Sequence, residues 1–352
     1  MESIQAVTYP VHFEEKGYSK LSELINNNNY SSIFILVDNN TIELCYPKFI
    51  QNLATNIKIE VIEIEAGEVF KNIETCIGVW NAMTELGADR KSLLITLGGG
   101  VITDLGGFVA STFKRGVDFV NIPTTLLSMV DASVGGKTGV DLGVLKNQIG
   151  LFSNPEMVIV DAEYLQTLSA REIRSGTAEI IKYGLTYDVS LFDQIKDNKQ
   201  LDITTLIHRS IEIKNEVVLE DPREQGLRKI LNFGHTIGHG VESYFLETES
   251  KETLTHGEAI SIGMVCETYV SAKLLGFSES KLAEIKKTII NIYGKTTILK
   301  EDYALIIDLL KHDKKNVGGQ VNFVLLNAIE DFKLDCKVSL KLIIESLDYY
   351  NI

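Results

Sequence analysis

Residues 92–113 read SLLITLGGGVITDLGGFVASTF, and they set the pattern of the first half of the chain. The first part, residues 92–97, is a short apolar run that predicts a buried strand. Three glycines follow directly, and residues 101–113 then have the pattern of a helix. Glycines at such a turn let backbone N–H groups approach a phosphate at the positive end of the helix, although a tight structural turn would need them as well. The spacing differs from the GxGxxG fingerprint of dinucleotide-binding proteins, so the glycine run alone leaves both interpretations open.

Strands and helices alternate on both sides of this unit. The other strands expected in this half are residues 32–37, 58–64, 116–122 and 157–160, and a helix is expected over residues 72–86. Such alternation predicts βαβ units and a mostly parallel sheet. After residue 167 helical patterns dominate, at residues 170–183, 203–219, 228–245, 256–275, 278–293 and 302–311, with one strand-like run at 321–326. We therefore expect an α/β domain over residues 1–165 and a mainly α-helical domain over residues 166–352.

The composition excludes several kinds of partner. The chain has 352 residues, of which 45% are hydrophobic and 23% are charged, as in globular proteins of two-domain size. Its formal net charge of −14 argues against nucleic acid or an anionic membrane as a partner. The four cysteines are scattered without a CxxC pair, which is typical of buried thiols in a reducing compartment. Because the sequence has neither a signal-peptide pattern nor an apolar run of transmembrane length, we expect a cytoplasmic protein with no membrane partner.

A second glycine-containing stretch, residues 123–139, reads PTTLLSMVDASVGGKTG. Its GGKT ending resembles the tail of a P-loop, but no glycine stands at the upstream position that the Walker spacing requires, so a nucleoside triphosphatase is excluded. What remains is a polar loop with charged side chains, followed by a lysine and an asparagine: Asp131, Lys137, Lys146 and Asn147. Two lysines and an asparagine on a mobile loop suit a phosphate, although solvated surface lysines would give the same pattern.

Three of the six histidines lie in or near residues 232–240, NFGHTIGHG. His235 and His239 are four residues apart, so on a helix both imidazoles lie on one face, and His256 follows after a polar loop. Such a set can hold a divalent metal, with Zn²⁺ the first choice, but polar residues on a half-buried helix would look the same. Thr236 stands where HExxH metalloproteases have a glutamate, so a protease would lack its general base.

Charged residues accompany these histidines. Glu179 and Lys182 lie one turn apart in an apolar segment, where they form either a simple helix ion pair or, for Glu179, a contact with a metal. Lys214 and Arg228 flank the histidine segment. If both point inward, they form a carboxylate-binding pair in which Arg228 can bind bidentately.

In this order, the motifs resemble the 3-dehydroquinate synthase family of the sugar-phosphate cyclase group, over nearly the whole chain. The matching stretches are residues 66–71, 98–104, 123–128, 131–138, 146–150, 175–184, 231–239, 256–258 and 313–315. The resemblance implies an N-terminal NAD-binding α/β domain, a C-terminal helical metal-binding domain and a homodimer.

The resemblance also implies roles for individual residues. The metal ligands would be Glu179, His235 and His256. The contacts to NAD would come from Asp38, Glu68, Lys71, Gly99, Gly100, Val101, Asp104, Thr124, Thr125, Asp131, Lys137 and Lys146. The substrate phosphate would be held by Lys137, Asn147, Lys314 and, from a neighbouring subunit, Arg115. The substrate carboxylate would contact Lys214, Arg228 and Asn232, and the reacting carbons would be lined by Asp131, Lys182 and His239.

The substrate of this family is a small anionic sugar acid phosphate, the seven-carbon keto acid phosphate DAHP, and the products are 3-dehydroquinate and phosphate. NAD⁺ takes a hydride transiently, phosphate leaves by β-elimination, the hydride returns, and the sugar ring opens and closes again by an aldol addition. The implied activity is that of a phosphate-eliminating carbon–oxygen lyase of the shikimate pathway, with NAD and Zn²⁺ or Co²⁺ as cofactors. Two features near the expected substrate depart from the family pattern, namely Met129 in place of a glutamine and the loop at residues 139–145.

Other classes of protein share parts of this pattern. A cyclase that makes an aminocyclitol or valiolone precursor acts on a substrate without a carboxylate, so the set Lys214, Arg228 and Asn232 argues against it. A metal- and NAD-dependent polyol dehydrogenase of the glycerol-dehydrogenase type needs no residues for a phosphate. The complete metal-ligand set argues against a degenerate NAD-binding regulator.

Overall fold

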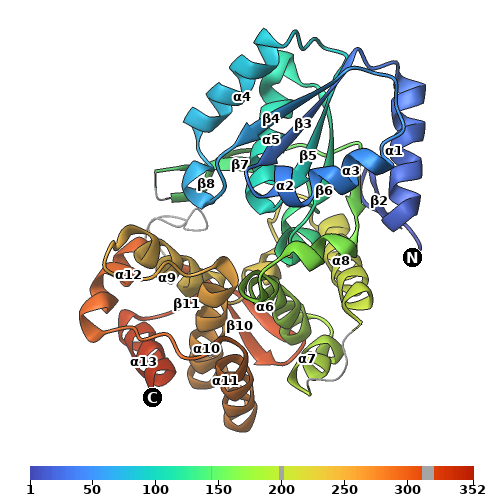
Figure 1. Cartoon of the computed structure of the whole chain (residues 1–352). Coiled ribbons are helices and arrows are strands. Elements are labelled where there is room, and N and C mark those ends of the chain that lie inside the picture. Colours follow the sequence, from blue (N-terminus) through green and yellow to red (C-terminus); the bar gives the residue numbers. More distant parts are fainter. Residues whose placement is uncertain (144, 198–201, 311–320) are drawn as a thin grey trace. The chain divides into compact units, whose positions relative to one another are not determined.

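The computed structural model describes residues 1–143, 145–197, 202–310 and 321–352, which form two compact units (Figure 1). The first unit comprises Met1–Ser169 and Ile203–Leu219, and the second comprises Ala170–Asp202 and Glu220–Ile352. Helix α8 (Ile203–Glu220) therefore groups with the α/β unit, although it follows the first helices of the helical half in the sequence. One reason is visible at the amino terminus, where Asn215 Nδ2 of α8 donates to the Gln5 carbonyl at 3.0 Å.

The first unit is built on a seven-stranded sheet in the order β1-β2-β9-β6-β5-β3-β4. The β1–β2 pair is antiparallel and the other pairs are parallel, so the expected α/β class is confirmed. The strands are β1 (Ile4–Gln5), β2 (Pro10–Phe13), β3 (Ser32–Asp38), β4 (Ile59–Ile64), β5 (Ser92–Gly98), β6 (Asp118–Pro123) and β9 (Met157–Val160). The two short strands at the amino terminus were not expected from the sequence.

Helices cover both faces of this sheet. The helices of the unit besides α8 are α1 (Glu14–Asn28), α2 (Thr41–Leu44), α3 (Tyr46–Asn52), α4 (Ile73–Glu85) and α5 (Gly100–Thr112). In β3, Phe34 and Leu36 pack into one core cluster with residues of α4 and α5. Ile33 and Ile35 alternate with them and are also fully buried, so the opposite face is covered as well.

The polar stretch after β6 folds differently from the sequence-based expectation. The expected mobile loop is an antiparallel hairpin of β7 (Lys137–Leu142) and β8 (Leu145–Phe152). Lys137 is the first residue of β7, whereas Lys146 and Asn147 lie in β8. The prediction failed because glycines usually interrupt strands, yet here Gly139 and Gly150 pair directly across the hairpin. A Cβ atom on Gly139 would lie 2.5 Å from the Ile149 carbonyl oxygen, so glycine allows the close approach of the two strands.

The second unit is mainly helical, as expected. Its helices are α6 (Ala170–Thr186), α7 (Val189–Lys196), α9 (His235–Glu247), α10 (His256–Leu275), α11 (Glu279–Tyr293), α12 (Tyr303–Leu310) and α13 (Leu340–Asn351). A two-stranded antiparallel sheet of β10 (Asn322–Ala328) and β11 (Asp331–Lys337) completes it. Helix α10 is apolar on all sides and is buried among α6, α9, α11, α13 and β10.

The prediction of a single helix over residues 228–245 is wrong for the residues before His235. Residues Leu227–Asn232 form a 3₁₀ turn, and α9 begins only at His235. The break lies at Gly234, whose φ of +78° is left-handed. The periodicity predicts that Arg228 and Asn232 share a helix with His235. In the structure they lie before that helix, in the 3₁₀ turn.

Among the described residues, no helix combines the length and the apolar character that crossing a bilayer requires.

Candidate active site

The expected cofactor residues gather at the carboxyl ends of the central strands. From β3 the chain runs to β4 on one side, whereas β5 and β6 lie on the other side of β3. In doubly wound sheets, the crevice at such a reversal of strand order is where ligands bind. Asp38 is the last residue of β3, and Gly99 and Gly100 follow directly on β5.

The glycine turn and the turn after β6 lie against each other. Thr124 N donates to the Gly98 carbonyl at 3.0 Å. A Cβ atom on Gly99 would lie 3.0 Å from Cγ2 of Thr125, so a larger residue would be crowded there. Gly99 precedes the first residue of α5, whose N–H groups point out of the helix end. A backbone surface that can accept a phosphate is thus formed between the two turns.

Lys71 holds this region together from the short turn after β4. Its Nζ lies 2.6 Å from Asp104 Oδ2 and 2.7 Å from Asn147 Oδ1. Burial lowers the pKa of Lys71, but Asp104, Glu68 and Asp141 outweigh that effect and raise it. The lysine therefore stays charged and links the turn, α5 and β8.

Asp141 belongs to the same network, although the sequence analysis did not single it out. Its Oδ1 accepts from Asn147 N at 2.6 Å, and its own N–H donates to the Lys71 carbonyl at 2.8 Å. Burial raises the pKa of Asp141 to about 6, with Lys71 opposing and Glu68 adding to the rise. On the other side of this network, Lys146 Nζ lies 3.1 Å from Glu68 Oε1. Asn147, expected at the substrate phosphate, thus contacts Lys71, which was expected at NAD.

Lys214 and Asp131 form the other charged pair of the first unit. Lys214 Nζ lies 2.7 Å from Asp131 Oδ1 and 2.5 Å from its carbonyl oxygen. Lys214 comes from α8, whereas Asp131 lies in the π-helical turn Ser128–Ala132. Met129, the departure from the family pattern, is fully buried in this turn.

The three expected metal ligands converge in the second unit. Glu179 is on α6, His235 is the first residue of α9, and His256 is the first residue of α10. Their ligand atoms all lie within 4.8 Å of one another. Glu179 Oε1 is 3.4 Å from His235 Nε2 and 3.5 Å from His256 Nε2. Among the described residues, this buried oxygen has no hydrogen-bond partner.

In both imidazoles, Nδ1 points away from Glu179 and lies beside a group that can only accept a hydrogen bond. His235 Nδ1 lies 3.1 Å from the Phe233 carbonyl, and His256 Nδ1 lies 3.2 Å from Glu242 Oε2. Both Nδ1 atoms must therefore carry the proton, so that both Nε2 atoms present lone pairs to Glu179 Oε1. Three lone pairs directed at one place require a cation, and one carboxylate with two imidazoles fits Zn²⁺ or Co²⁺.

The pKa values describe the balance of charge when no metal is bound. Burial lowers the pKa of His256, but Glu242 and Glu179 outweigh it and raise the pKa to about 9. Burial likewise opposes ionisation of Glu179, yet Lys182 and His235 hold its pKa well below the usual range. The Glu179 carboxylate thus stays negative. When no metal is bound, the positive charge of a protonated His256 partly replaces that of the cation.

Close helix packing positions the two histidines. A Cβ atom on Gly263 of α10 would lie 1.8 Å from the Gly234 carbonyl oxygen, which precedes α9. A Cβ atom on Gly257 would lie 2.0 Å from the Ser175 carbonyl oxygen of α6. The amino end of α10 is further held by Arg171, whose Nη2 lies 2.8 Å from Glu258 Oε2.

Lys182 and His239 flank the ligand set. Lys182 Nζ forms an ion pair with Glu179 Oε2, the carboxylate oxygen that does not face the imidazoles. Glu179 can therefore form the helix ion pair with one oxygen and contact a metal with the other. The two alternatives that the sequence left open are compatible. The His239 ring centroid is 5.3 Å from that of His235, and His239 also clusters with Glu242 and His256 within 4.8 Å.

Arg228 and Asn232 lie together in the second unit. Arg228 is buried, and its Nη1 donates to the Pro222 carbonyl at 2.8 Å. Asn232 Nδ2 donates to Glu224 Oε1 at 2.7 Å. Lys214, the third residue expected at the substrate carboxylate, belongs to the first unit instead.

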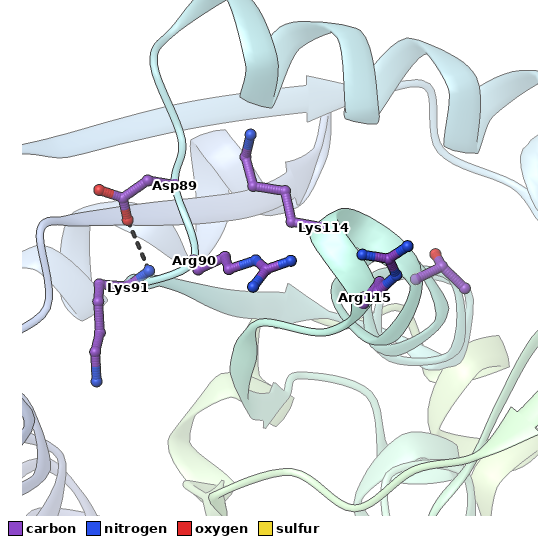
Figure 2. Close-up of a pocket in the computed structure, with 6 residues that line it drawn as sticks. Asp89, Arg90, Lys91, Lys114 and Arg115 are labelled. Atoms are coloured by element: carbon purple, nitrogen blue, oxygen red, sulfur yellow. Dashed lines mark hydrogen bonds between the residues drawn. The ribbon is translucent and has the colours of Figure 1, made fainter.

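Arg115 lies away from the cofactor residues, at the opposite end of α5. It lines an open hollow of about 820 Å³ together with Asp89, Arg90, Lys91, Thr112 and Lys114 (Figure 2). These residues flank the amino ends of β5 and β6, whereas the glycine turn follows the carboxyl end of β5. Helix α5 separates the two places by about 20 Å, at 1.5 Å per residue.

Several residues that shape the site escaped the sequence analysis, namely Asp141, Glu224, Glu242 and Glu267. Glu242 and Glu267 had a usable signal, because each is an acidic residue inside an apolar helical run and such a charge needs a partner. Lys314, expected at the phosphate, lies outside the described residues, as do Lys315 and position 144 of the departing loop.

Comparisons with known proteins agree with this geometry. The family model described as 3-dehydroquinate synthase N-terminal matches residues 61–175, and the one described as 3-dehydroquinate synthase C-terminal matches residues 176–316. A curated 3-dehydroquinate synthase from Parabacteroides distasonis is 42% identical over 338 residues, which are 94% of this chain and 95% of that protein.

Two solved structures are similar over the whole chain. A 2-epi-5-epi-valiolone synthase (ValA) from Streptomyces hygroscopicus subsp. jinggangensis 5008, with NAD⁺ and Zn²⁺ bound, has 27% identity and a TM-score of 0.85, with 99% of this chain and 98% of that chain covered. A 2-deoxy-scyllo-inosose synthase complexed with carbaglucose-6-phosphate, NAD⁺ and Co²⁺ has 22% identity, a TM-score of 0.87 and 99% coverage of both chains, which shows a shared fold.

Proposed function

The chain belongs to the 3-dehydroquinate synthase family, and from this premise we propose the part that each of its residues takes in the reaction. The protein is a phosphate-eliminating lyase that converts DAHP to 3-dehydroquinate and phosphate. Its cofactors are NAD and one divalent metal ion. When bound, NAD accepts and returns a hydride, and the metal lowers the pKa of the hydroxyl group that is oxidised.

Residues 1–165 bind NAD and contribute some contacts to the substrate, whereas residues 166–352 bind the metal and the rest of the substrate. The pyrophosphate lies on the turn formed by Gly99, Gly100 and Val101, because backbone N–H groups at a helix end favour an anion. Around it, the other NAD contacts come from Asp38, Glu68, Lys71, Asp104, Thr124, Thr125 and Lys146. The buried ion pair of Lys71 with Asp104 supports this part, since it holds the turn after β4 against α5.

Glu179, His235 and His256 hold the metal. The observation that carries this assignment is the buried Glu179 Oε1, which faces two imidazole Nε2 atoms and has no hydrogen-bond partner among the described residues. Three protein ligands leave coordination positions for the substrate hydroxyl, as a catalytic site requires. Lys182 neutralises the second oxygen of Glu179. In this role it would also line the reacting carbons.

Proton transfer falls to His239, with Asp131 as a second polar group beside the reacting carbons. The His239 imidazole lies one turn from a metal ligand, where it can accept a proton from a substrate carbon or hydroxyl. Its neighbour His235 cannot take this role, because its Nε2 lone pair is directed at the metal position. The substrate phosphate can itself remove a proton before it leaves.

Cationic side chains orient the two anionic ends of the substrate. Arg228, Asn232 and Lys214 bind the carboxylate. Lys137, Asn147 and Lys314 bind the phosphate. Fixing both ends of a flexible chain supplies much of the rate, because the reacting groups are held in the productive geometry.

Arg115 acts on a second copy of the chain, in a homodimer. The hollow of Arg90, Lys91, Lys114 and Arg115 is about one helix length from the glycine turn, so Arg115 does not serve the NAD site that α5 begins. An exposed cationic cluster on a chain with net charge −14 suits the phosphate of a neighbouring subunit. We also propose a cytoplasmic location, which the four buried free thiols support.

One assay tests the function. Purified protein with NAD⁺ and Zn²⁺ or Co²⁺ is given DAHP, and we expect stoichiometric release of phosphate without accumulation of NADH. A polyol dehydrogenase would accumulate NADH, and a cyclase of another substrate class would leave DAHP unchanged; either result would contradict the proposal. His235→Ala should lose metal and activity together, whereas the matched variant His208→Ala, on α8 of the other unit, should keep both.

A further inference from the structure

Glu267 is a fully buried acid on α10 that holds the start of the helix carrying His235. Its Oε2 accepts from Gly234 N at 2.7 Å, and its Oε1 accepts from Ile237 N at 3.0 Å. Gly234 is the residue before α9, and as a glycine it has no side chain of its own to cap the helix. Glu267 therefore caps α9 from a neighbouring helix, with both carboxylate oxygens in use.

His235 lies between the two N–H groups that Glu267 accepts. Its position is thus defined at the residue before it and at the second residue after it. The carbonyl of Phe233, which orients the His235 ring through Nδ1, belongs to the same turn. A small change in this turn would rotate the ring and move Nε2 away from Glu179 Oε1.

The electrostatics point the same way. Both His235 and His256 are the first residues of their helices, so the metal position faces two helix amino ends. Each such end carries about +0.5 of an elementary charge, which opposes a divalent cation. At α10 this charge is offset by Glu258, whose Oε2 accepts from Thr255 N at 2.8 Å. At α9 the offsetting carboxylate is Glu267.

We propose that Glu267 is a positioning residue of the metal centre, which acts through the α9 cap to hold His235 and to offset the charge of the helix end. The inference rests on the metal site described above. The substitution Glu267→Gln keeps the size of the side chain but removes its charge. One oxygen remains to accept a hydrogen bond, and an NH₂ group is turned toward the other backbone N–H. We expect zinc to bind about 10- to 100-fold more weakly, the range found when groups that orient metal ligands are lost.

The test compares zinc affinity, the visible spectrum of the Co²⁺-loaded protein and the thermal midpoint of the metal-free protein. We expect E267Q to weaken zinc binding and to change the cobalt spectrum, because His235 turns. NAD binding should not change, since its residues lie in the other unit. Thr268→Val is the matched control: this residue is next on α10, is equally buried, and its hydroxyl donates to Met264 O of its own helix.

A purely structural role would lower the thermal midpoint of E267Q and leave the zinc affinity and the cobalt spectrum as in the unaltered protein; that result would overturn the inference. If E267Q does not fold, Glu267→Asp serves instead, since it keeps the charge but shortens the reach, and unchanged zinc affinity there would equally overturn it. Failure of the metal site itself is recognised separately, because the unaltered protein would then bind no zinc or His235→Ala would still bind it.

Discussion

Glu242 Oε2 lies 3.2 Å from Nδ1 of His256. Glu242 is on α9 and His256 is on α10, and both helices belong to the second unit. Because the carboxylate accepts the Nδ1 proton, the Nε2 lone pair of His256 is directed at Glu179. A carboxylate behind a metal-binding imidazole both fixes the ring and makes it a better ligand.

Removing this carboxylate should therefore weaken the metal site in two steps. Glu242→Gln keeps an oxygen for Nδ1 but loses the charge, and Glu242→Ala loses both, so we expect zinc affinity to fall about 10-fold and about 100-fold respectively. Competition with a chromophoric chelator measures both. Glu247→Gln, at the exposed end of the same helix, is the control and should bind zinc normally. Normal zinc affinity in Glu242→Ala would refute the assigned role.

The metal affinity should depend on pH through His256. Its pKa is raised to about 9 because Glu242 and Glu179 outweigh burial, so at neutral pH zinc must displace a proton from it. Apparent zinc affinity should fall about tenfold for each pH unit below that pKa, as for any ligand that must lose one proton. Competition titrations between pH 6.5 and 8.5 measure the slope; a flat profile would contradict the assignment.

The metal-free protein should show the opposite trend in stability. A histidine whose pKa is raised on folding stabilises the fold fully below its unfolded pKa of about 6.5, and this contribution disappears as the pH rises through the folded pKa. The thermal midpoint of the metal-free protein should therefore decrease between pH 7 and pH 9.5, roughly the window between these two values. Saturating zinc should remove most of this decrease, because the bound metal replaces the proton.

Lys71 should be essential to the stability of the first unit as well as to NAD binding. Lys71→Met leaves Asp104 without its 2.6 Å partner, and we expect a loss of about 3 kcal/mol in the free energy of unfolding. The double variant Lys71→Met with Asp104→Asn should recover most of the stability but not the NAD affinity. Denaturant unfolding and NAD titration separate the two effects.

The control for this pair is Lys58→Met, which breaks an exposed pair with Glu60 and should change stability by less than about 1 kcal/mol. An equal loss in Lys58→Met and Lys71→Met would mean that the burial of the Lys71 network contributes nothing.

Gly263 should not tolerate even a methyl group. In Gly263→Ala the Cβ atom would lie 1.8 Å from the Gly234 carbonyl, so α9 and α10 must move apart. We expect a loss of about 3 kcal/mol in stability together with weaker zinc binding, because both histidine-bearing helix ends are displaced. Gly78→Ala provides the contrast: this glycine is in α4 with nothing within 4 Å of the added Cβ, and the same change should stabilise by about 0.5–1 kcal/mol. Thermal unfolding of both variants checks the signs.

The sequence alone was sufficient for the features that depend on short-range patterns. The strand, glycines and helix of residues 92–113 predicted the parallel α/β unit, since apolar periodicity and glycine turns act over a few residues. The resemblance of whole motifs also predicts the set Glu179, His235 and His256. Even there, periodicity alone misplaced the start of the helix by joining Arg228 to His235, because it could not register the left-handed turn at Gly234.

Only the tertiary structure decided which groups orient and neutralise the site. Glu242 reaches His256 across 14 positions, and Glu267 reaches Gly234 across 33, so both contacts exist only after the helices have packed. Lys214 likewise meets Asp131 from 83 residues away, because α8 groups with the α/β unit. Such contacts leave no periodic pattern in the chain. The energies of these contacts depend on burial and on the distances between packed helices. Those distances are set where glycines such as Gly263 allow two backbones to approach closely, and they are defined only in the folded protein.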